Sequence, residues 1–141
     1  MESPPLVTSD GELIVPIRAD VDILLARQKA RALVMPLRFS TSELTVIATA
    51  ISEVARNIVS YAGQGEVELA IVQQGARRGL RVIARDHGPG IADIERAMQD
   101  GFSTSRSLGL GLPGSKRLMD EFQIASQIGE GTVVTMIKWE H

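Results

Sequence analysis

Two pairs of short strand-like segments, each joined by a tight turn, constrain the fold of this chain most strongly. In residues 66–73 and 79–85, apolar side chains alternate with other side chains around the turn Gln-Gly-Ala-Arg-Arg-Gly. Residues 123–128 and 132–139 repeat this arrangement around a Gly-Glu-Gly turn. Because strands joined by short turns pair antiparallel, we expect a largely antiparallel sheet.

The rest of the chain alternates between helical and extended patterns. We predict a further strand over residues 12–18 and helices over residues 20–35, 41–62, 91–99 and 113–122. The second helix has the clearest ends, since Ser40 and Glu43 have capping-box spacing and Gly63 follows its last turn. The sequence therefore predicts an α+β sandwich in which helices cover one face of a mixed, mostly antiparallel sheet.

Composition limits the domain count and the class of protein. The 141 residues, 44% of them hydrophobic, suit one compact domain over residues 12–141, preceded by a flexible, proline-containing arm over residues 1–11. A net charge of −2 argues against non-specific nucleic-acid binding, and zero cysteines exclude disulfides and thiolate zinc sites. We expect a cytoplasmic protein, because no apolar run approaches the roughly 18 residues of a membrane span.

The second predicted helix carries the first candidate site. Its apolar stripe comprises Ile47, Ile51, Val54 and Ile58. Glu53 and Asn57 are one turn apart on one flank of that stripe, and Arg56 is predicted to lie on the opposite, solvated side. An amide oxygen can bind Mg²⁺, and a carboxylate can accept a proton. The alternative is an ordinary polar edge of an amphipathic helix.

The loop Asp86-His87-Gly88-Pro89-Gly90 follows a predicted strand and forms the second candidate site. Its two glycines allow a sharp turn and the close approach of a flat ligand. An aspartate at a strand end can accept a hydrogen bond from an exocyclic amine such as that of adenine. The alternative is a simple strand-to-helix turn, and His87 fits an exposed loop position better than a catalytic one.

Two glycine-containing segments nearer the C-terminus are the remaining candidates. Gly109-x-Gly111-x-x-Gly114 opens a predicted helix, where free backbone N–H groups can bind phosphate and Lys116 can add charge. It lacks the strand context of a dinucleotide fingerprint, and a flexible surface loop is the alternative. Gly131-Thr132 begins the last strand, and the Thr132 hydroxyl is expected near Asp86, sharing a water with it; a plain hairpin turn is the alternative.

Taken in order, these motifs resemble one known superfamily. Glu53-x-x-x-Asn57, Asp86-x-Gly88-x-Gly90, Gly109-x-Gly111-x-x-Gly114 and Gly131-Thr132 are similar to the N, G1 and G2 boxes and the closing Gly-Thr of the GHKL (Bergerat-fold) ATPases. Within that superfamily the chain resembles the RsbT-type serine/threonine-protein kinases. The similarity runs from about Ile14 to Trp139 and includes Gly111-Leu112-Pro113-Gly114 and Lys116-Arg117-Leu118-Met119-Asp120-Glu121-Phe122.

The resemblance implies roles for the site residues. Glu53 would act as general base, Asn57 would bind Mg²⁺, and Asp86 would bind the adenine amine of ATP. The resemblance assigns the nucleotide pocket, lid and phosphate cradle to the glycines of the two boxes: Gly88, Gly90, Gly109, Gly111 and Gly114. We further expect Lys116 to neutralise phosphate charge and Thr132 to support the nucleotide pocket.

The resemblance also implies partners. Members of the RsbT type phosphorylate STAS-domain proteins in stressosome and partner-switching pathways, and when released they activate a PP2C-type phosphatase. The alternative function is that of an anti-sigma-factor-like binding module, which sequesters a partner while ATP tunes the affinity. The sequence predicts no nucleic-acid or membrane partner.

Overall fold

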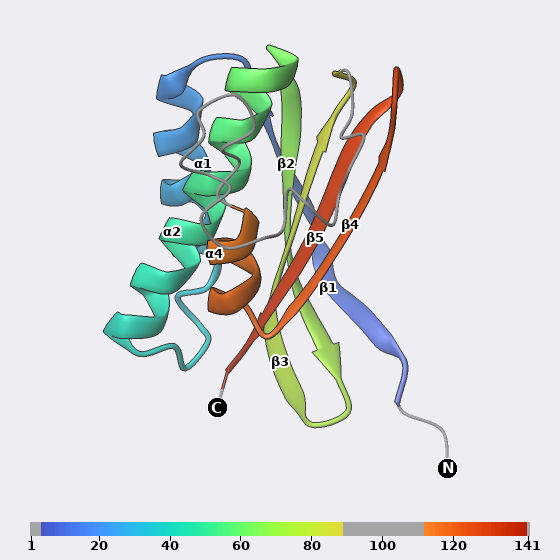
Figure 1. Ribbon diagram of the computed structural model, residues 1–141. Helices are drawn as coiled ribbons and strands as arrows, with labels where there is room; N and C mark the ends of the chain where they lie inside the picture. Colours follow the sequence, from blue (N-terminus) through green and yellow to red (C-terminus); the bar gives the residue numbers. More distant parts are fainter. Residues whose placement is uncertain (1–3, 89–111, 141) are drawn as a thin grey trace.

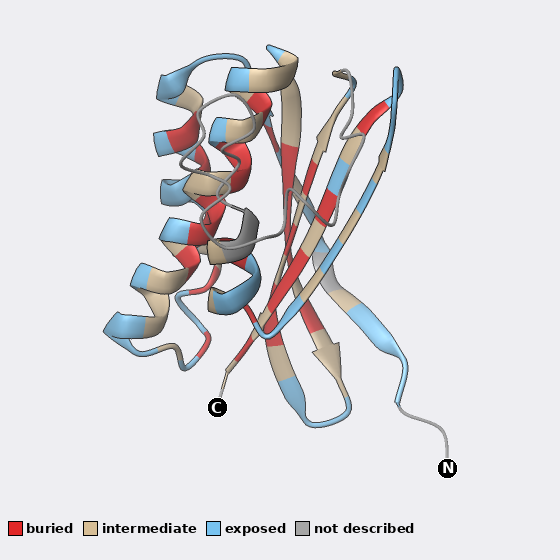
Figure 2. Cartoon of the chain, in the orientation of Figure 1, coloured by how far each residue is buried: buried red, intermediate tan, exposed pale blue. Residues whose placement is uncertain are grey.

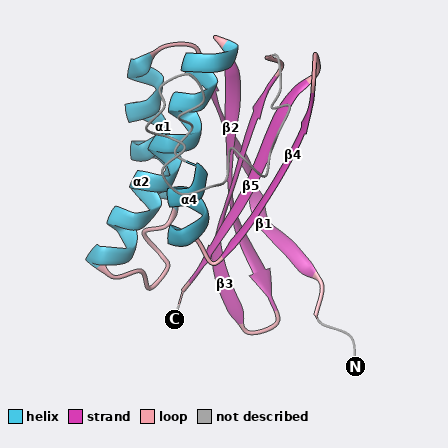
Figure 3. Ribbon diagram, in the orientation of Figure 1, coloured by secondary structure: helices cyan, strands magenta, loops and turns pink. Residues whose placement is uncertain are grey.

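The computed structural model describes residues 4–88 and 112–140, which form one antiparallel sheet with helices packed against one of its faces (Figures 1 and 3). The five strands lie in the order β1-β2-β3-β5-β4, and every neighbouring pair is antiparallel. The strands are β1 (Leu6–Ile17), β2 (Gly65–Gln74), β3 (Arg77–Asp86), β4 (Glu121–Gln127) and β5 (Gly131–Trp139). The helices are α1 (Asp20–Leu33), α2 (Thr41–Asn57), the π-helical turn η1 (Ile58–Ala62) and α4 (Leu112–Leu118). The predicted α+β sandwich is confirmed.

The core lies between the helices and the near face of the sheet (Figure 2). Alternate residues of the strands, such as Val67, Leu69 and Val82, point into it and are fully buried. From the helical layer, α2 contributes Ile51 and Val54, which are also buried. Packing of the α2 stripe on the sheet therefore leaves only the flanks of that helix for a site. Among the described helices, none has the length and apolar character needed to cross a membrane.

The predicted ends of the second helix are confirmed. Ser40 Oγ accepts the Glu43 N–H at 3.1 Å, and Glu43 Oε1 accepts the Ser40 N–H at 2.9 Å, which completes the capping box. The last turn widens into the π-helical η1, and Gly63 ends it with φ of 84° while donating its N–H to Ile58 O at 2.8 Å. A residue other than glycine would be strained at this φ.

The prediction of a flexible arm over residues 1–11 is wrong for residues 6–11. Leu6 to Ser9 pair with the end of β2, so β1 begins six residues before the predicted strand. The register shifts between Ser9 and Leu13, and Gly11 takes φ of 80° in that irregularity. This bulge breaks the alternation of side chains, and for that reason the sequence pattern showed only the second half of the strand.

The predicted helix over residues 113–122 ends early, because its last residues belong to β4. Asp120 donates its N–H to Ile137 O at 3.0 Å, and its Oδ2 accepts the Trp139 N–H at 2.8 Å. These bonds to β5 turn the chain out of α4 and into β4, which begins at Glu121. The helix predicted over residues 91–99 lies outside the described residues.

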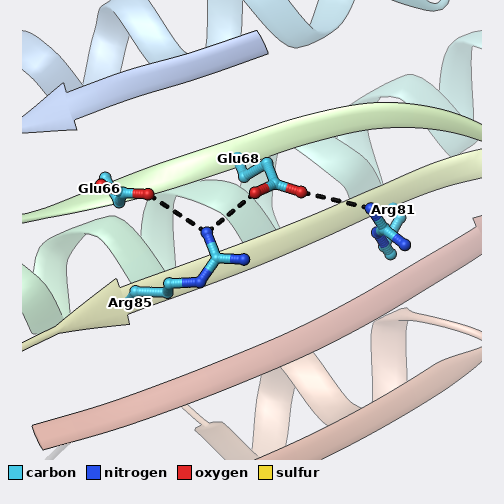
Figure 4. A network of polar contacts seen from close by, with 4 residues as sticks. All are labelled: Glu66, Glu68, Arg81 and Arg85. Carbon is cyan, nitrogen blue, oxygen red and sulfur yellow. Dashed lines mark hydrogen bonds and ion pairs between the residues drawn. The ribbon is translucent and has the colours of Figure 1, made fainter. Parts of the chain in front are cut away.

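A network of ion pairs covers the face of the sheet that points away from the helices (Figure 4). Arg85 Nη1 lies 3.2 Å from Glu66 Oε2 and 2.9 Å from Glu68 Oε1, and Arg81 Nη2 lies 3.3 Å from Glu68 Oε2. Glu68 is buried, so its charge depends on these two partners. The network joins β2 to β3 across the residues that lead directly to Asp86.

Glu140 fastens the end of the last strand to the loop between α1 and α2. Its Oε2 accepts the Arg38 N–H at 2.7 Å, and its Oε1 lies 3.0 Å from Arg78 Nε. The Arg38 N–H lowers the pKa of this carboxyl group below its ordinary value, and Arg78 lowers the pKa further. Burial acts in the opposite direction on the pKa but does not outweigh these contacts.

We predict that Glu140→Gln destabilises the protein near neutral pH and much less in acid. Because the pKa is lower in the folded chain, the carboxylate stabilises the fold above the unfolded-state pKa, and this stabilisation disappears as the pH falls through the folded-state pKa. The loss in unfolding free energy should be about 1–2 kcal/mol at neutral pH. Urea unfolding at several pH values measures it, with the exposed Glu130→Gln as control. A loss that does not depend on pH would contradict the prediction.

Candidate functional site

The carboxylate of Asp86 joins three segments at one end of the sheet. Asp86 is the last residue of β3, and its Oδ1 accepts the Gly88 N–H at 2.9 Å and the Thr132 N–H at 3.3 Å. Within residues 4–88 and 112–140, no hydrogen bond engages Oδ2. One oxygen is therefore fixed by the backbone, and the other remains an acceptor for a ligand donor.

Two glycines allow the backbone to approach this carboxylate closely. A Cβ at Gly88 would lie 2.6 Å from Ala62 Cβ, so only glycine fits between Asp86 and η1. Gly131 has φ of 116°, and a Cβ there would overlap Asp86 O. The predicted close approach of a flat ligand at Gly88 stays a prediction, and the close neighbour in the structure is Ala62, which sequence reasoning missed.

Thr132 contacts Asp86 directly through its backbone N–H, and its predicted water-shared hydroxyl contact stays a prediction. The hydroxyl is 2.8 Å from Ser126 Oγ, which also donates to Gly131 O at 3.1 Å. Ser126 faces Thr132 in the β4–β5 register. This pairing could have been found by aligning the two strands around their Gly-Glu-Gly turn, and it holds the start of β5 against Asp86.

Glu53 and Asn57 occupy the flank of α2 that was predicted for them. Both residues are partly exposed beside the buried Val54. Arg56 is exposed on the side away from the buried stripe, as predicted, and its Nη1 is 3.7 Å from Glu53 Oε1. Residues three positions apart in a helix are separated by only about 60° around the helix axis, so the Glu53 and Arg56 side chains are neighbours.

The π-helical turn connects this flank of α2 to the end of the sheet. Asn57 is the last residue of α2, and η1 then carries the chain to Ala62, which packs against Gly88. Single π-helical turns occur frequently at functional sites. No sequence signal indicated the wider turn, yet it brings the Glu53 and Asn57 helix into contact with the Asp86 loop.

The phosphate-cradle prediction is covered only in part by the described residues. Gly114 lies in α4, where an added Cβ would meet no described atom within 4 Å, and Lys116 is exposed on the same helix. Ser115 and Met119 are buried and fasten α4 to the core beside α2. Gly90, Gly109 and Gly111 lie outside the described residues.

The donor set suits a nucleotide and its accompanying metal better than a protein-held ion. Over the described ranges, no cluster of three His, Cys, Asp or Glu side chains could hold a metal. Asn57 offers a single hard amide oxygen, which fits Mg²⁺ because this ion keeps several waters and takes its other ligands from phosphates. Asp86 Oδ2 offers an acceptor for the exocyclic amine of a base.

Comparison with known proteins agrees with this geometry. The family model described as "Histidine kinase-like ATPase domain" matches residues 17–138. The serine/threonine-protein kinase RsbT of Bacillus subtilis (strain 168) is 52% identical over 125 residues, which are 89% of this chain and 94% of the relative. The anti-sigma F factor of Anoxybacillus flavithermus is 35% identical over 120 residues, and that of Geobacillus stearothermophilus 34% over 120 residues; each alignment covers 80% of this chain and 81% of the relative.

We predict opposite effects for two glycine-to-alanine changes. Gly88→Ala should lower the unfolding free energy by about 1–3 kcal/mol, because the new methyl group overlaps Ala62. Gly114→Ala is the matched control: it sits in a helix, its added Cβ meets no described atom within 4 Å, and it should be neutral or stabilise by up to about 1 kcal/mol. Chemical denaturation of both variants measures the difference. Equal stability of Gly88→Ala and the parent chain would contradict the close contact.

Proposed function

The chain belongs to the histidine kinase-like ATPase family and is a serine/threonine-protein kinase of the RsbT type, and we propose that its acceptors are Ser or Thr side chains of STAS-domain proteins in a partner-switching pathway. The structural observation behind its ATP-dependent part is the Asp86 carboxylate, with Oδ1 held by two backbone N–H groups and Oδ2 without a hydrogen bond among the described residues. Similarity to the RsbT kinase over 94% of its length supports the acceptor class.

Asp86 reads the base in this proposal. Since Oδ1 is engaged by Gly88 and Thr132, Oδ2 is the oxygen that accepts a hydrogen bond from the adenine exocyclic amine. A 6-oxo purine presents a carbonyl oxygen at the same position and would face the carboxylate without a donor. The Ser126–Thr132 pair and the Gly131 turn keep the carboxylate in this orientation.

Glu53 is the general base in this proposal, and Asn57 binds Mg²⁺. The Glu53 carboxylate takes the proton of the acceptor hydroxyl as the hydroxyl oxygen attacks the γ-phosphorus of ATP, the bond from that phosphorus to the β–γ bridging oxygen breaks, and ADP leaves. The Asn57 amide oxygen would contribute one ligand to Mg²⁺, which would supply charge neutralisation for the transferred phosphoryl group. Lys116 adds positive charge from α4. In addition to Gly88, we assign the predicted phosphate-binding and pocket roles to Gly90, Gly109, Gly111 and Gly114.

Release from the acceptor is proposed to let the kinase activate a PP2C-type phosphatase or another output protein. This step needs a binding surface and no further chemistry. The anti-sigma F factors at 34–35% identity support a second candidate function, that of a binding module that sequesters a regulatory partner with ATP as affinity tuner. Incubation with labelled ATP, Mg²⁺, STAS-domain proteins encoded nearby and candidate sigma factors separates the two: phosphate transfer to a STAS-domain protein supports the kinase, and stable capture of a sigma factor without transfer supports the module.

Asp86→Asn should change base preference. Because Oδ1 keeps its two backbone donors, the amide NH₂ of asparagine takes the place of Oδ2 and can only donate. Affinity for ATP should fall by about 10- to 100-fold, while affinity for the 6-oxo analogue inosine triphosphate should rise relative to ATP. Isothermal titration with both nucleotides measures this. Unchanged discrimination would exclude Asp86 as the adenine reader.

Glu53→Gln should slow phosphate transfer by about 100-fold or more and leave ATP affinity close to that of the parent. The amide keeps the shape of the side chain but cannot accept the proton. Single-turnover transfer to a cognate STAS protein is the measurement. Thr49→Ala is the control, since this exposed α2 hydroxyl bonds only to Thr45 O of its own helix among the described contacts. Transfer at the parental rate in Glu53→Gln would refute the general base.

A further inference from the structure

Helix α1 is apolar on two sides, and only one of them packs on the sheet. Ile23, Ala26 and Ala30 are buried in the core. The opposite side exposes large apolar side chains: Val21 is 69% exposed, Leu24 50% and Leu25 39%. Single exposed apolar residues are ordinary, but several on one helix face form a patch that indicates a binding surface.

The exposed residues form a continuous stripe. At 100° per residue, Val21, Leu24 and Leu25 fall within an arc of about 100°, and Gln28 and Ala32 continue the same arc. From Val21 to Ala32 the stripe is about 16 Å long. Met35, which is 79% exposed, follows just beyond the helix end. This α1 stripe (Val21, Leu24, Leu25, Gln28 and Ala32) has the length of three turns of a partner helix.

A groove between α1 and α2 extends the stripe sideways. Leu24 and Gln28 of the stripe line it together with Arg27 and Arg31 of α1, and Leu44 and Ile47 form its wall on α2. The two helices lie side by side over the sheet (Figure 1). The groove is formed by the first half of α2, whereas Glu53 and Asn57 lie in the second half. A partner seated in it therefore leaves the candidate nucleotide site accessible.

Positive charge lies along both edges of the stripe. Arg27 and Arg31 are on one edge and Lys29 is on the other, and all three are exposed. None of them forms an ion pair with an acidic side chain of the described chain. The acidic residues of α1 are confined to its first turn, where the Asp22 carboxylate accepts the Arg18 and Ala19 N–H groups.

We propose that the α1 stripe and its groove dock an acidic amphipathic helix of a protein partner. The apolar face of such a helix covers Leu24 and Leu25, and its acidic edges pair with Arg27, Arg31 and Lys29. A second copy of this chain fits poorly, because two α1 helices laid face to face bring the same three cations together. A membrane surface fits poorly as well, because the stripe is short and contains no aromatic anchor.

The test uses the full chain and a defined probe. The probe is a fluorescein-labelled helical peptide of about 18 residues with leucines on one face and glutamates along both edges, and the control peptide carries lysine in place of glutamate. Binding is followed by fluorescence anisotropy. The variants are Leu24→Ser and the double change Arg27→Glu/Arg31→Glu. Ile128→Ser is the matched control, since Ile128 is a 74% exposed apolar residue in the β4–β5 turn.

The acidic peptide should bind the parent chain, and each α1 variant should weaken this binding by about tenfold or more, with Ile128→Ser unchanged. ATP affinity should stay the same in all variants, which separates this surface from the nucleotide site. Equal binding of the lysine peptide, no binding at about 1 mM, or α1 variants that bind like the parent would overturn the proposal. So would binding only to phosphatidylglycerol vesicles, or self-association of the parent that Leu24→Ser abolishes in sedimentation.

Discussion

One carboxylate oxygen organises the candidate site. Oδ1 of Asp86 accepts the N–H groups of Gly88 and Thr132, so that the end of β3, the loop after it and the start of β5 share a single acceptor. The close approach this requires explains two glycines, one against Ala62 and one against Asp86 O. The other oxygen has no hydrogen bond among the described residues, and in the proposed site it would accept one from the exocyclic amine of a base. Recognition of adenine would therefore depend on the main chain that surrounds Asp86 as well as on its side chain.

The sheet supplies the rigidity that this arrangement needs. On its helix side, the buried stripe of α2 packs on the sheet and thereby positions Glu53 and Asn57 on the flank of that helix. The π-helical turn η1 then brings the chain from α2 into contact with Gly88. On its other side, the ion pairs of Glu66 and Glu68 with Arg81 and Arg85 join β2 to β3 immediately before Asp86 (Figure 4). Glu68 is the buried member of this network, and removing both of its arginine partners would leave its charge uncompensated.

Much of the fold and part of the site could be predicted from the sequence, since local patterns encode them. The alternation of apolar side chains with other side chains predicted the two hairpins, and the capping box of Ser40 and Glu43 predicted the start of α2. Helical spacing predicted that Glu53 and Asn57 share one flank of that helix. The first half of β1 was missed, because a bulge interrupts its alternation and its pairing is with residues about 65 positions away. Ser126 was missed as the partner of the Thr132 hydroxyl for a similar reason, because strand register sets this pair.

In the proposed site, Asp86, Gly88 and Thr132 form the end of the ATP pocket that recognises adenine. Amide NMR during titration with ATP and Mg²⁺ tests this proposal most directly, because the Gly88 and Thr132 N–H groups donate to the oxygen beside the proposed contact. The chemical shifts of both amides should change together and saturate with ATP, and they should change far less with inosine triphosphate. The amide signals of the α1 stripe should not shift. Shifts confined to other segments, or identical shifts with both nucleotides, would contradict it.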